Sequence, residues 1–366
     1  MSPIRWTLAA VGVLLSGCLA GCQSSHSSPT RSVALSSSAS CSPRPATATR
    51  SVTVLAGTGS AGYSGDGGPA VRARLSGPQS VAVDAAGNVY IADTQNARVR
   101  LVASDGRIST VAGNGTRRSS GDGRPAVTAS LESPTVVAVD AQGRVLIADT
   151  GANRVRRIAR DGTILTLAGT GSYGASGDNG PATAAQLGTP EGLATDHHGY
   201  VYVAQGPLDV VRGLAPDGKV HTVAGTGVAG TLDHNGDGGP ATQAPLNQPQ
   251  ALTTDAAGDL FIAEIFPERV RRVTAAGTIS TVLGGTPGAC SPIRFPAGLA
   301  VDSSGALYVS DRERGQILRL DPSGTVTYLT GLSRLQTPDG LALDEHGHLY
   351  VADDHANRVW RVTLSN

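Results

Sequence analysis

The 366-residue chain has no surplus of positive charge and almost no lysine. Lysine plus arginine number 29, aspartate plus glutamate also number 29, and Lys219 is the only lysine. A nucleic-acid-binding domain usually has a basic surplus, so this balance argues against that class. The sequence also lacks a Gly-x-Ser-x-Gly nucleophile elbow and a complete phosphate-binding P-loop, two common signatures of enzymes.

Glycine and proline are abundant and disfavour long helices. The chain has 48 glycines and 21 prolines, together 69 of 366 residues, or about 19 % against an average near 12 %. Both residues interrupt helices and mark turns, which argues against a helical bundle. Hydrophobic residues make up 40 % of the chain, enough for a packed core and too many for a disordered protein.

The N-terminus has the pattern of a bacterial lipoprotein signal. Arg5 precedes an apolar run at 6–15 that is too short for a spanning helix and suits a signal-peptide core. Two tetrads that resemble a lipobox follow, Leu-Ser-Gly-Cys ending at Cys18 and Leu-Ala-Gly-Cys ending at Cys22. We expect residues 1–22 to be a signal peptide with lipidation at Cys22, Cys18 being the alternative. The protein would then be exported and held on the outer side of the cell membrane by its acyl chains.

Residues 23–50 predict a flexible tether, because they are rich in Ser, Thr, Pro and Ala and contain no acid. The region 51–366 contains 25 bases and 29 acids, a net charge of −4, so the globular part is mildly acidic. Cys41 lies in the tether and Cys290 in a predicted loop. Outside the cytoplasm the two can form a disulfide; free thiols or an intermolecular bridge are the alternatives.

A repeat occurs six times in residues 51–366. Each copy begins with proline, continues through two alternating runs separated by Asp-x-x-Gly, and includes a third and a fourth run. The copies begin at Pro78, Pro134, Pro190, Pro249, Pro296 and Pro338. Alternation is typical of strands, and Asp with Gly is typical of tight turns. Four short antiparallel strands repeated six times predict a six-bladed β-propeller, an all-β fold.

The two ends of the repeat region complement each other. The sixth copy stops after its third run, near residue 364, whereas the segment 51–59 matches a fourth run. We therefore expect the N-terminal strand to complete the last blade. Ring closure of this kind removes exposed sheet edges and predicts one propeller domain over residues 51–366.

The repeats resemble the NHL-repeat family of six-bladed propellers. The resemblance rests on the P-x-G-[LV]-A-[VL]-D start, the GNVYIADT-type second strand and the Asn-Arg start of the third strand, as in residues 143–158. It covers essentially all of residues 51–366. Membership implies the propeller fold and a binding role, although related propellers include metal-dependent lactonases and lyases.

Four connections between blades are long and alike. They occupy 60–77, 114–133, 172–189 and 228–248, and each contains a Gly-Asp-x-x-Pro-Ala motif followed by a leucine. Strand order places them on the same face as the connections between strands two and three, which we call the loop face; the other is the turn face. We expect about two helical turns in each insertion, with the leucine packing inward. The insertion aspartates, as candidates for an interaction surface, are Asp66, Asp122, Asp178 and Asp237. The alternative is that each insertion only seals the gap between two blades.

Asp233, Asn235 and Asp237 begin a sequence of the calcium-loop type. The twelfth position holds Ala244 where a glutamate is usual, so an Asx-rich turn is the favoured interpretation and calcium the alternative. Two histidine pairs, His197 with His198 and His346 with His348, fall in turns on opposite blades, which argues against a zinc site. No other cofactor is expected.

An acidic residue ends strand two, and an arginine begins strand three, in several blades. Each acid can reach the arginine across its own hairpin, so these pairs are interpreted as structural. They are Asp93 with Arg98, Asp149 with Arg154, and Asp353 with Arg358. Positions that break the pattern are more informative about function, namely Gln205, Glu264, Arg312 and Glu313.

Three functional hypotheses follow. The favoured one is a membrane-anchored extracytoplasmic binding or scaffold protein that holds a protein or cell-envelope ligand on its loop face. The alternative is a metal-dependent hydrolase or lyase with a site in the central channel, for which the sequence offers no convergent set of ligands. RNA binding, known from some NHL proteins, conflicts with export and with the acidic propeller.

Overall fold

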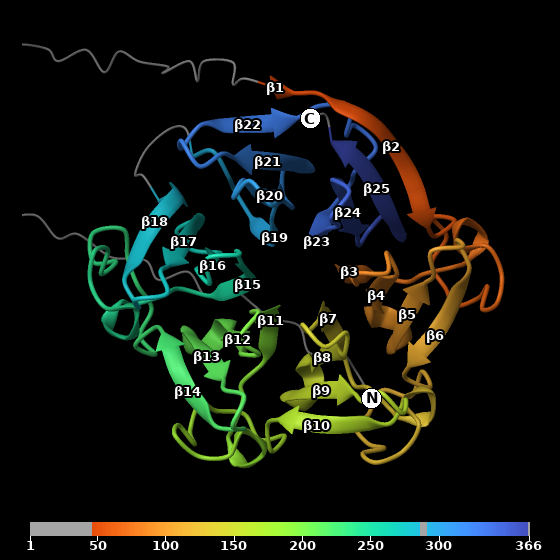
Figure 1. The fold of residues 1–366 in the computed structure, drawn as a ribbon, viewed down its shortest axis with the longest axis horizontal. Helices are drawn as coiled ribbons and strands as arrows, with labels where there is room; N and C mark the ends of the chain where they lie inside the picture. The colour runs from red at the N-terminus through yellow and green to blue at the C-terminus, as the bar shows by residue number, and fades with distance from the viewer. Residues whose placement is uncertain (1–45, 286–290, 365–366) are drawn as a thin grey trace, which may run out of the picture. The chain divides into compact units, whose positions relative to one another are not determined.

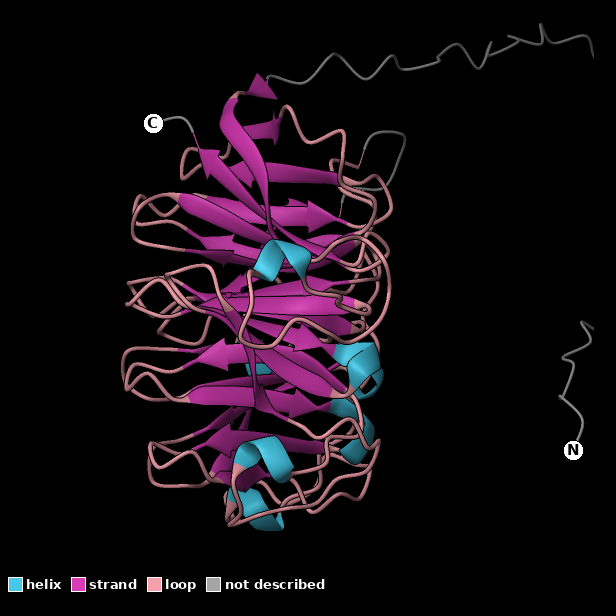
Figure 2. Ribbon diagram, turned by 90° about the vertical axis from the view of Figure 1, so that its right-hand side faces the viewer, coloured by secondary structure: helices cyan, strands magenta, loops and turns pink. Residues whose placement is uncertain are grey.

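The computed structural model describes residues 46–285 and 291–364. Within them, six antiparallel sheets are arranged around a central axis, with the first strand of each sheet innermost (Figure 1). The protein is therefore a six-bladed β-propeller. Viewed edge-on, short turns lie along one face of the ring and the longer connections along the other (Figure 2).

Each of the first four blades is a meander of four consecutive strands. Blade 1 has β3 (Pro78–Val83), β4 (Val89–Asp93), β5 (Arg98–Val102) and β6 (Ile108–Ala112). Blade 2 has β7 (Pro134–Val139), β8 (Val145–Asp149), β9 (Arg154–Ile158) and β10 (Ile164–Ala168). Blade 3 has β11 (Pro190–Thr195), β12 (Val201–Gln205), β13 (Val210–Leu214) and β14 (Val220–Ala224). Blade 4 has β15 (Pro249–Thr254), β16 (Leu260–Glu264), β17 (Arg269–Val273) and β18 (Ile279–Gly284).

The last two blades include strands from the N-terminal part of the chain. Blade 5 has β19 (Pro296–Val301), β20 (Leu307–Asp311), β21 (Gln316–Leu320) and β22 (Val326–Leu329). Blade 6 has β23 (Pro338–Leu343), β24 (His348–Asp353) and β25 (Arg358–Leu364). The outer strand of blade 6 is β2 (Thr49–Ala56), which pairs antiparallel with β25, and β1 (Ala46–Thr47) pairs parallel with β22. Thus β1 and the start of β2 lie in the stretch that the sequence assigned to the tether.

The turn chemistry inferred from the repeat is visible in atomic detail. In blade 1, one carboxylate oxygen of Asp84 accepts hydrogen bonds from the backbone nitrogens of Ala86 and Asn88, at 3.0 and 2.9 Å. Gly87 follows with a φ of 77°, a conformation that glycine adopts without strain. The aspartate side chain therefore stabilises the bend between strands one and two, as expected for an Asx turn.

The hydrophobic core lies between neighbouring blades. Ile91 of blade 1 packs in one cluster with Val359 of blade 6 and with Leu75 of the insertion between them. The insertion leucines pack inward as the sequence predicts, since each is fully buried: Leu75, Leu131, Leu187 and Leu246. Each insertion therefore closes the seam between two blades.

The predicted two helical turns in each insertion were wrong. The structure has one three-residue 3-10 turn at each position, with extended backbone directly after it. The turn is short because the chain must reach the buried leucine within a few residues and then begin the next strand at a proline. The insertion turns are η1 (Ala70–Arg72), η3 (Ala126–Thr128), η5 (Ala182–Ala184) and η7 (Ala241–Gln243). Three further turns follow strand two: η2 (Thr94–Asn96), η4 (Thr150–Ala152) and η6 (Gly206–Leu208).

Several sequence-based expectations lie outside the described residues. They are the signal peptide 1–22 with Cys18 and Cys22, most of the tether 23–50, and the Cys41–Cys290 disulfide. Within residues 46–285 and 291–364, no helix is long and apolar enough to cross a membrane.

The insertion leucines are expected to contribute strongly to stability. Replacing Leu131 by alanine removes a fully buried side chain and should lower the free energy of unfolding by about 2–5 kcal/mol. The control is Leu165→Ala in β10, where the side chain is 37 % exposed and the loss should stay below about 1 kcal/mol. Urea unfolding measures both, and equal losses would contradict the proposed role of the insertion.

Candidate functional site

The four insertion aspartates each contact a buried arginine in strand three of the following blade. The arginines are at most 1 % exposed, whereas the aspartates are 32–51 % exposed. The pairs are Asp66 with Arg100, Asp122 with Arg156, Asp178 with Arg212 and Asp237 with Arg271. The carboxylates that the sequence nominated as interaction residues are therefore already engaged within the protein.

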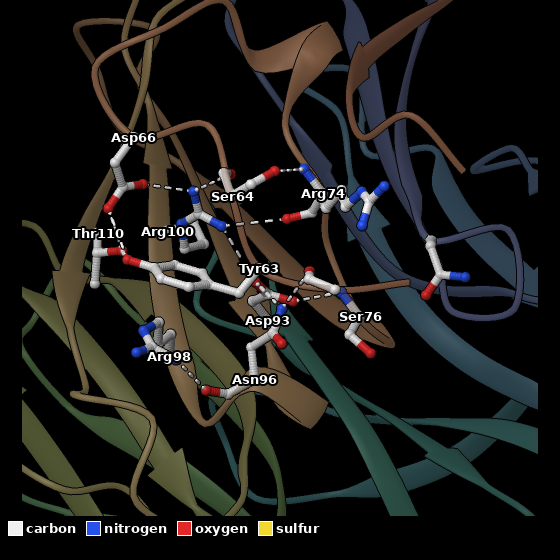
Figure 3. A network of polar contacts seen from close by, with 12 residues as sticks. Tyr63, Ser64, Asp66, Arg74, Ser76, Asp93, Asn96, Arg98, Arg100 and Thr110 are labelled. Carbon is white, nitrogen blue, oxygen red and sulfur yellow. Dashed lines mark hydrogen bonds and ion pairs between the residues drawn. The ribbon is translucent and has the colours of Figure 1, made fainter. Parts of the chain in front are cut away.

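Figure 3 shows the first of these networks in full. The guanidinium of Arg100 contacts Asp66 at 2.5 Å and Asp93 at 3.3 Å, and it also donates to the backbone oxygen of Ser64 at 3.2 Å. Thr110 in β6 donates to the second oxygen of Asp66 at 2.8 Å. The network thus joins the insertion, strand two, strand three and strand four of one blade.

The pKa values of the two acids in this network shift in opposite directions. Burial raises the pKa of Asp93 above its ordinary value, despite hydrogen bonds from Ser76 and Asn96 and the charge of Arg100. Burial also acts on Asp66, but the hydrogen bond from Thr110 and the charge of Arg100 outweigh it and lower the pKa. The network therefore favours the charged form of Asp66, the partly exposed acid that pairs with the buried Arg100.

The predicted partner of Asp93 was wrong. Asp93 and Arg98 are opposite each other in the β4–β5 register, but Arg98 donates to the backbone oxygens of Asn96 and Asn114, at 2.9 and 2.8 Å. The carboxylate contacts Arg100 instead. The reason is that Arg98 lies at the rim, where carbonyl oxygens are within reach, whereas Arg100 points inward beneath the insertion.

The same correction applies to the other two predicted pairs. Arg154 donates to the backbone oxygen of Thr170 at 2.7 Å, and Asp149 faces Arg156 at 3.8 Å. In blade 6, Arg358 donates to the backbone oxygen of Thr58 at 2.8 Å. There Asp353 accepts a hydrogen bond from the indole of Trp360 at 3.0 Å. In these blades the arginine that begins strand three therefore donates to backbone oxygens at the edge of the blade. The residue two positions later, Arg156 or Trp360, contacts the acid at the end of strand two.

Blades 3 and 4 replace the acid at the end of strand two. Gln205, at the end of strand two in blade 3, is fully buried. Because it is neutral, the network of Arg212 and Asp178 in this blade has one acid fewer than those of blades 1 and 2. In blade 4 the buried Glu264 contacts both Arg269 and Arg271, and burial raises its pKa despite these two charges. Both departures are accommodated inside the blade, so they mark packing variants of one structural network.

The calcium-type sequence does not form an open cation site. Asp237 contacts Arg271 at 2.6 Å, and the amide of Asn235 donates to Asp237 at 3.0 Å. A guanidinium therefore occupies the position that a cation would need. Across residues 46–285 and 291–364, no group of three or more His, Cys, Asp or Glu is placed to hold a metal ion.

The paired histidines lie in or next to turns. The rings of His197 and His198 are 3.9 Å apart between centroids and tilted to each other. Nδ1 of His348, the first residue of β24, lies 2.8 Å from Asp344, the aspartate of the preceding turn. His346 and His348 are neighbours at 6.4 Å between ring centroids. Each pair interacts within its own blade.

A cavity of about 230 Å³ lies at the loop-face end of the central channel. Its wall is formed by the residue that follows the first proline of each blade, which we call the inner ring: Gln79, Thr135, Glu191, Gln250, Ala297 and Asp339. Thr150 and Arg312, which follow the ends of β8 and β20, also line it. The cavity is therefore built from all six blades.

An apolar ring closes the floor of this cavity. The same side chains line both this cavity and a second one of about 220 Å³ on the turn-face side. They are Val81, Val137, Leu193, Leu299 and Leu341, each two residues beyond the inner ring. Leu252, at the same position of blade 4, lines the loop-face cavity. The channel is thus divided in two by aliphatic side chains, and the charged residues that line it, Glu191, Arg312 and Asp339, all belong to the loop-face half.

Asp339 is the most perturbed acid of the cavity. Its side chain is 8 % exposed, and the nearest cation is Arg312 at 3.8 Å. Burial raises the pKa of Asp339 to about 7, with Arg312 opposing the shift and Asp354 and Asp353 adding to it. Arg312 makes its closer contact, at 3.0 Å, with Asp354. Burial also raises the pKa of Glu191 in blade 3.

Sequence reasoning identified one residue of this cavity. Arg312 was singled out because it breaks the strand-two pattern, and it lines the cavity. The other positions so singled out lie elsewhere: Gln205 and Glu264 are buried within blades, and Glu313 is exposed. The inner ring was missed, although its signal was present. The residue after each repeat proline varies from blade to blade, and only blades 3 and 6 have an acid there.

Comparison with known proteins agrees with the repeat and the fold. The model of the teneurin NHL domain matches residues 44–120, and the model of the NHL repeat matches residues 294–320. This six-bladed propeller therefore contains NHL-type repeats in the two matched segments. Teneurin-4 of Mus musculus is 29 % identical over 232 residues, which cover 57 % of this chain and 8 % of that protein. The chain thus spans a small part of the curated relatives that it matches.

Two solved structures share the fold at low sequence identity. An auxiliary nutrient binding protein from Bacteroides thetaiotaomicron has a TM-score of 0.59 at 15 % identity, covering 85 % of this chain and 75 % of that one. A gluconolactonase from Xanthomonas campestris has a TM-score of 0.57 at 17 % identity, covering 80 % of this chain and 87 % of that one. At these identities the comparison establishes that this chain shares the propeller fold, and it establishes nothing about function.

The corrected ion pairs give a direct test. Arg156→Met leaves Asp149 buried without its counter-charge and should lower the free energy of unfolding by about 3–5 kcal/mol. Arg154→Met removes only hydrogen bonds at the rim and should cost about 1 kcal/mol or less. Urea unfolding of the two variants decides between the pairings, because the original Asp149–Arg154 pair would reverse the order.

Asp339 should make stability depend on pH. Because its folded pKa, about 7, lies above the ordinary value of 3.8, its contribution is fully present below pH 4 and is lost as the pH rises to 7. Asp339→Asn removes this pH-dependent loss of stability, because asparagine does not ionise. We expect the variant to be more stable than the wild type at pH 8, by on the order of 2–4 kcal/mol, with little difference at pH 4. Thermal unfolding at both pH values measures this, and a constant difference would refute it.

Proposed function

We propose that this NHL propeller is an exported, lipid-anchored binding protein that presents its loop face to a protein or cell-envelope ligand. The proposed anchor is an acylated cysteine, Cys22 with Cys18 as the alternative. The sequence supports export through the apolar run at 6–15 and the two lipobox-like tetrads after it. The propeller itself supports a binding role, because its elaborated connections gather on one face.

The observation that favours the loop face is a group of exposed apolar side chains there. Tyr173 and Val228 lie in two insertions, and Phe266 lies in the connection between strands two and three of blade 4. They are 53 %, 67 % and 51 % exposed. Large apolar side chains exposed on the elaborated loops of one face are typical of interaction surfaces. The insertion aspartates attach these loops to the blades through their contacts with buried arginines.

The similar proteins agree with a binding role in part. One structural neighbour is described as an auxiliary nutrient binding protein, and the teneurins contain an NHL domain of the same type. Fold similarity at this level is an analogy. It supports the class of function and leaves the ligand to experiment.

A second candidate is a metal-dependent hydrolase or lyase with its site in the channel. The observation that favours it is the pair of buried acids in the cavity, Asp339 and Glu191, together with the gluconolactonase among the structural neighbours. Metal analysis of the purified protein separates the two candidates. A stoichiometric ion whose removal abolishes a turnover would favour the enzyme.

The anchor is tested by substitution of both candidate cysteines. Cys22→Ser should move the full-length protein from the membrane fraction to the soluble fraction and abolish incorporation of a labelled fatty acid. Cys18→Ser is the matched control and should leave both unchanged. The opposite result assigns the lipid to Cys18, and membrane association of the double variant would refute lipid anchoring.

The binding surface is tested by capture from cell-envelope extract. The triple variant Tyr173→Ser, Val228→Ser and Phe266→Ser should lose most of the material that the wild-type chain retains, because it removes the exposed apolar contacts. Leu165→Ser changes an exposed leucine on an outer strand and serves as the control. Equal capture by the wild type and the triple variant would overturn the loop-face proposal.

A further inference from the structure

The residues that line the cavity at the loop-face end of the channel include hydrogen-bond acceptors that lack donors in the described part of the chain. Asp339 and Glu191 contribute carboxyl groups, and the side-chain oxygen of Gln250 is buried without a hydrogen-bond partner in the described part of the chain. Buried acceptors without donors are costly in free energy. A ligand that brings donors would relieve this cost.

Asp339 is the strongest sign of an absent partner. The residue is 6 % exposed, and its carboxylate accepts no hydrogen bond from residues 46–285 or 291–364. Arg312 lies 3.8 Å away, beyond hydrogen-bonding distance, and is bound more closely by Asp354 at 3.0 Å. The charge of the one nearby cation is therefore shared between two acids.

Glu191 faces the cavity from the opposite side of the ring. It lies in blade 3 and Asp339 in blade 6, three blades apart. Gly206, next to the end of β12, makes room for it, because a Cβ at this position would collide with the Glu191 carboxylate. Five of the six blades have a larger residue at the position of Gly206: Thr94, Thr150, Ile265, Arg312 and Asp354. Space for the Glu191 carboxylate is thus specific to blade 3.

The charge and shape of the cavity define a class of ligand. Two acids and one arginine line it, and that arginine is already bound to a third acid, so the cavity favours a cation. The floor is aliphatic, which favours a hydrocarbon skeleton. The volume of about 230 Å³ is below the range of about 300–1,000 Å³ that is common for drug-sized ligands.

We propose that this cavity binds a small aliphatic amine, with ammonium groups held by Asp339 and Glu191 and the carbon chain on the apolar floor. Because the two carboxyl groups belong to opposite blades, a diamine offers an ammonium group to each, whereas a monoamine offers only one. The site is distinct from the exposed apolar side chains of the loop face. The inference therefore goes beyond the proposed function and requires neither the lipid anchor nor a protein partner.

Calorimetric titration of the purified full-length chain at pH 8 tests the proposal, with 1,4-diaminobutane as the probe. Aliphatic amines remain charged at this pH, since their pKa is near 10. The matched neutral compound is 1,4-butanediol, which has the same chain length. We expect saturable binding of the diamine, at least tenfold tighter than any binding of the diol, with butylamine between the two.

Three variants assign the binding to the cavity. Asp339→Asn and Glu191→Gln should each weaken diamine binding at least tenfold, and Glu313→Gln, which removes an exposed acid beside Arg312, should leave it unchanged. Circular dichroism confirms that each variant is folded. Absence of saturable diamine binding, equal affinity for the diol, or full affinity in Asp339→Asn would overturn the proposal. Displacement of the diamine by an equal concentration of Ca²⁺ would also overturn it, in favour of a metal site.

Failure of this test is distinguishable from failure of the proposed function. The titration uses neither membranes nor envelope extract, and the capture experiment changes no residue of the cavity. Equal capture by the wild type and the triple variant, with intact diamine binding, refutes the loop-face proposal alone. Loss of capture in the triple variant, without diamine binding by the wild type, refutes the amine site alone.

Discussion

The ion pair between an insertion aspartate and a buried arginine connects the parts of this propeller that the chain brings together from a distance. Arg100 is fully buried and contacts Asp66, 34 residues earlier, and Asp93 at the end of strand two. A buried guanidinium without such partners would be strongly destabilising. Because the contact requires the insertion to lie over the next blade, it fixes the seam between blades and places the elaborated connections on one face. In blades 1 to 4 the same constraint acts on the channel cavity, since the strands that line it there follow directly after the insertions.

Much of the architecture could be predicted from the sequence, because it follows from local patterns. Each first strand begins at its repeat proline, and each blade has the third and fourth strands that the repeat predicts. The buried leucines of the insertions were also predicted, because a single leucine after a polar, glycine-rich stretch has one clear destination. Strand alternation, turn residues and isolated leucines are signals that a few neighbouring residues carry.

The side-chain partners were harder to predict. The register does place Asp93 opposite Arg98, but which arginine reaches the acid depends on what else is within reach in three dimensions. Backbone oxygens at the rim attract Arg98, whereas Arg100 points beneath an insertion that is distant in sequence. The cavity was missed for a related reason. Glu191 and Asp339 are 148 positions apart, and only ring closure brings the residues that follow the repeat prolines around one space.

The chain enters the ring through two strand pairings of different length, a short one with blade 5 and a long one with blade 6. Before β2 enters blade 6, the two residues of β1 pair with β22 of blade 5, and the Thr47 oxygen accepts a hydrogen bond from the Thr330 nitrogen at 3.0 Å. A pull on the chain before Ala46 therefore loads blade 5 first, through a short pairing that can separate while β2 stays in place. Only then does tension reach the long β2–β25 pairing that completes blade 6. The short strand acts as a strain relief, so moderate tension is absorbed before it bears on ring closure.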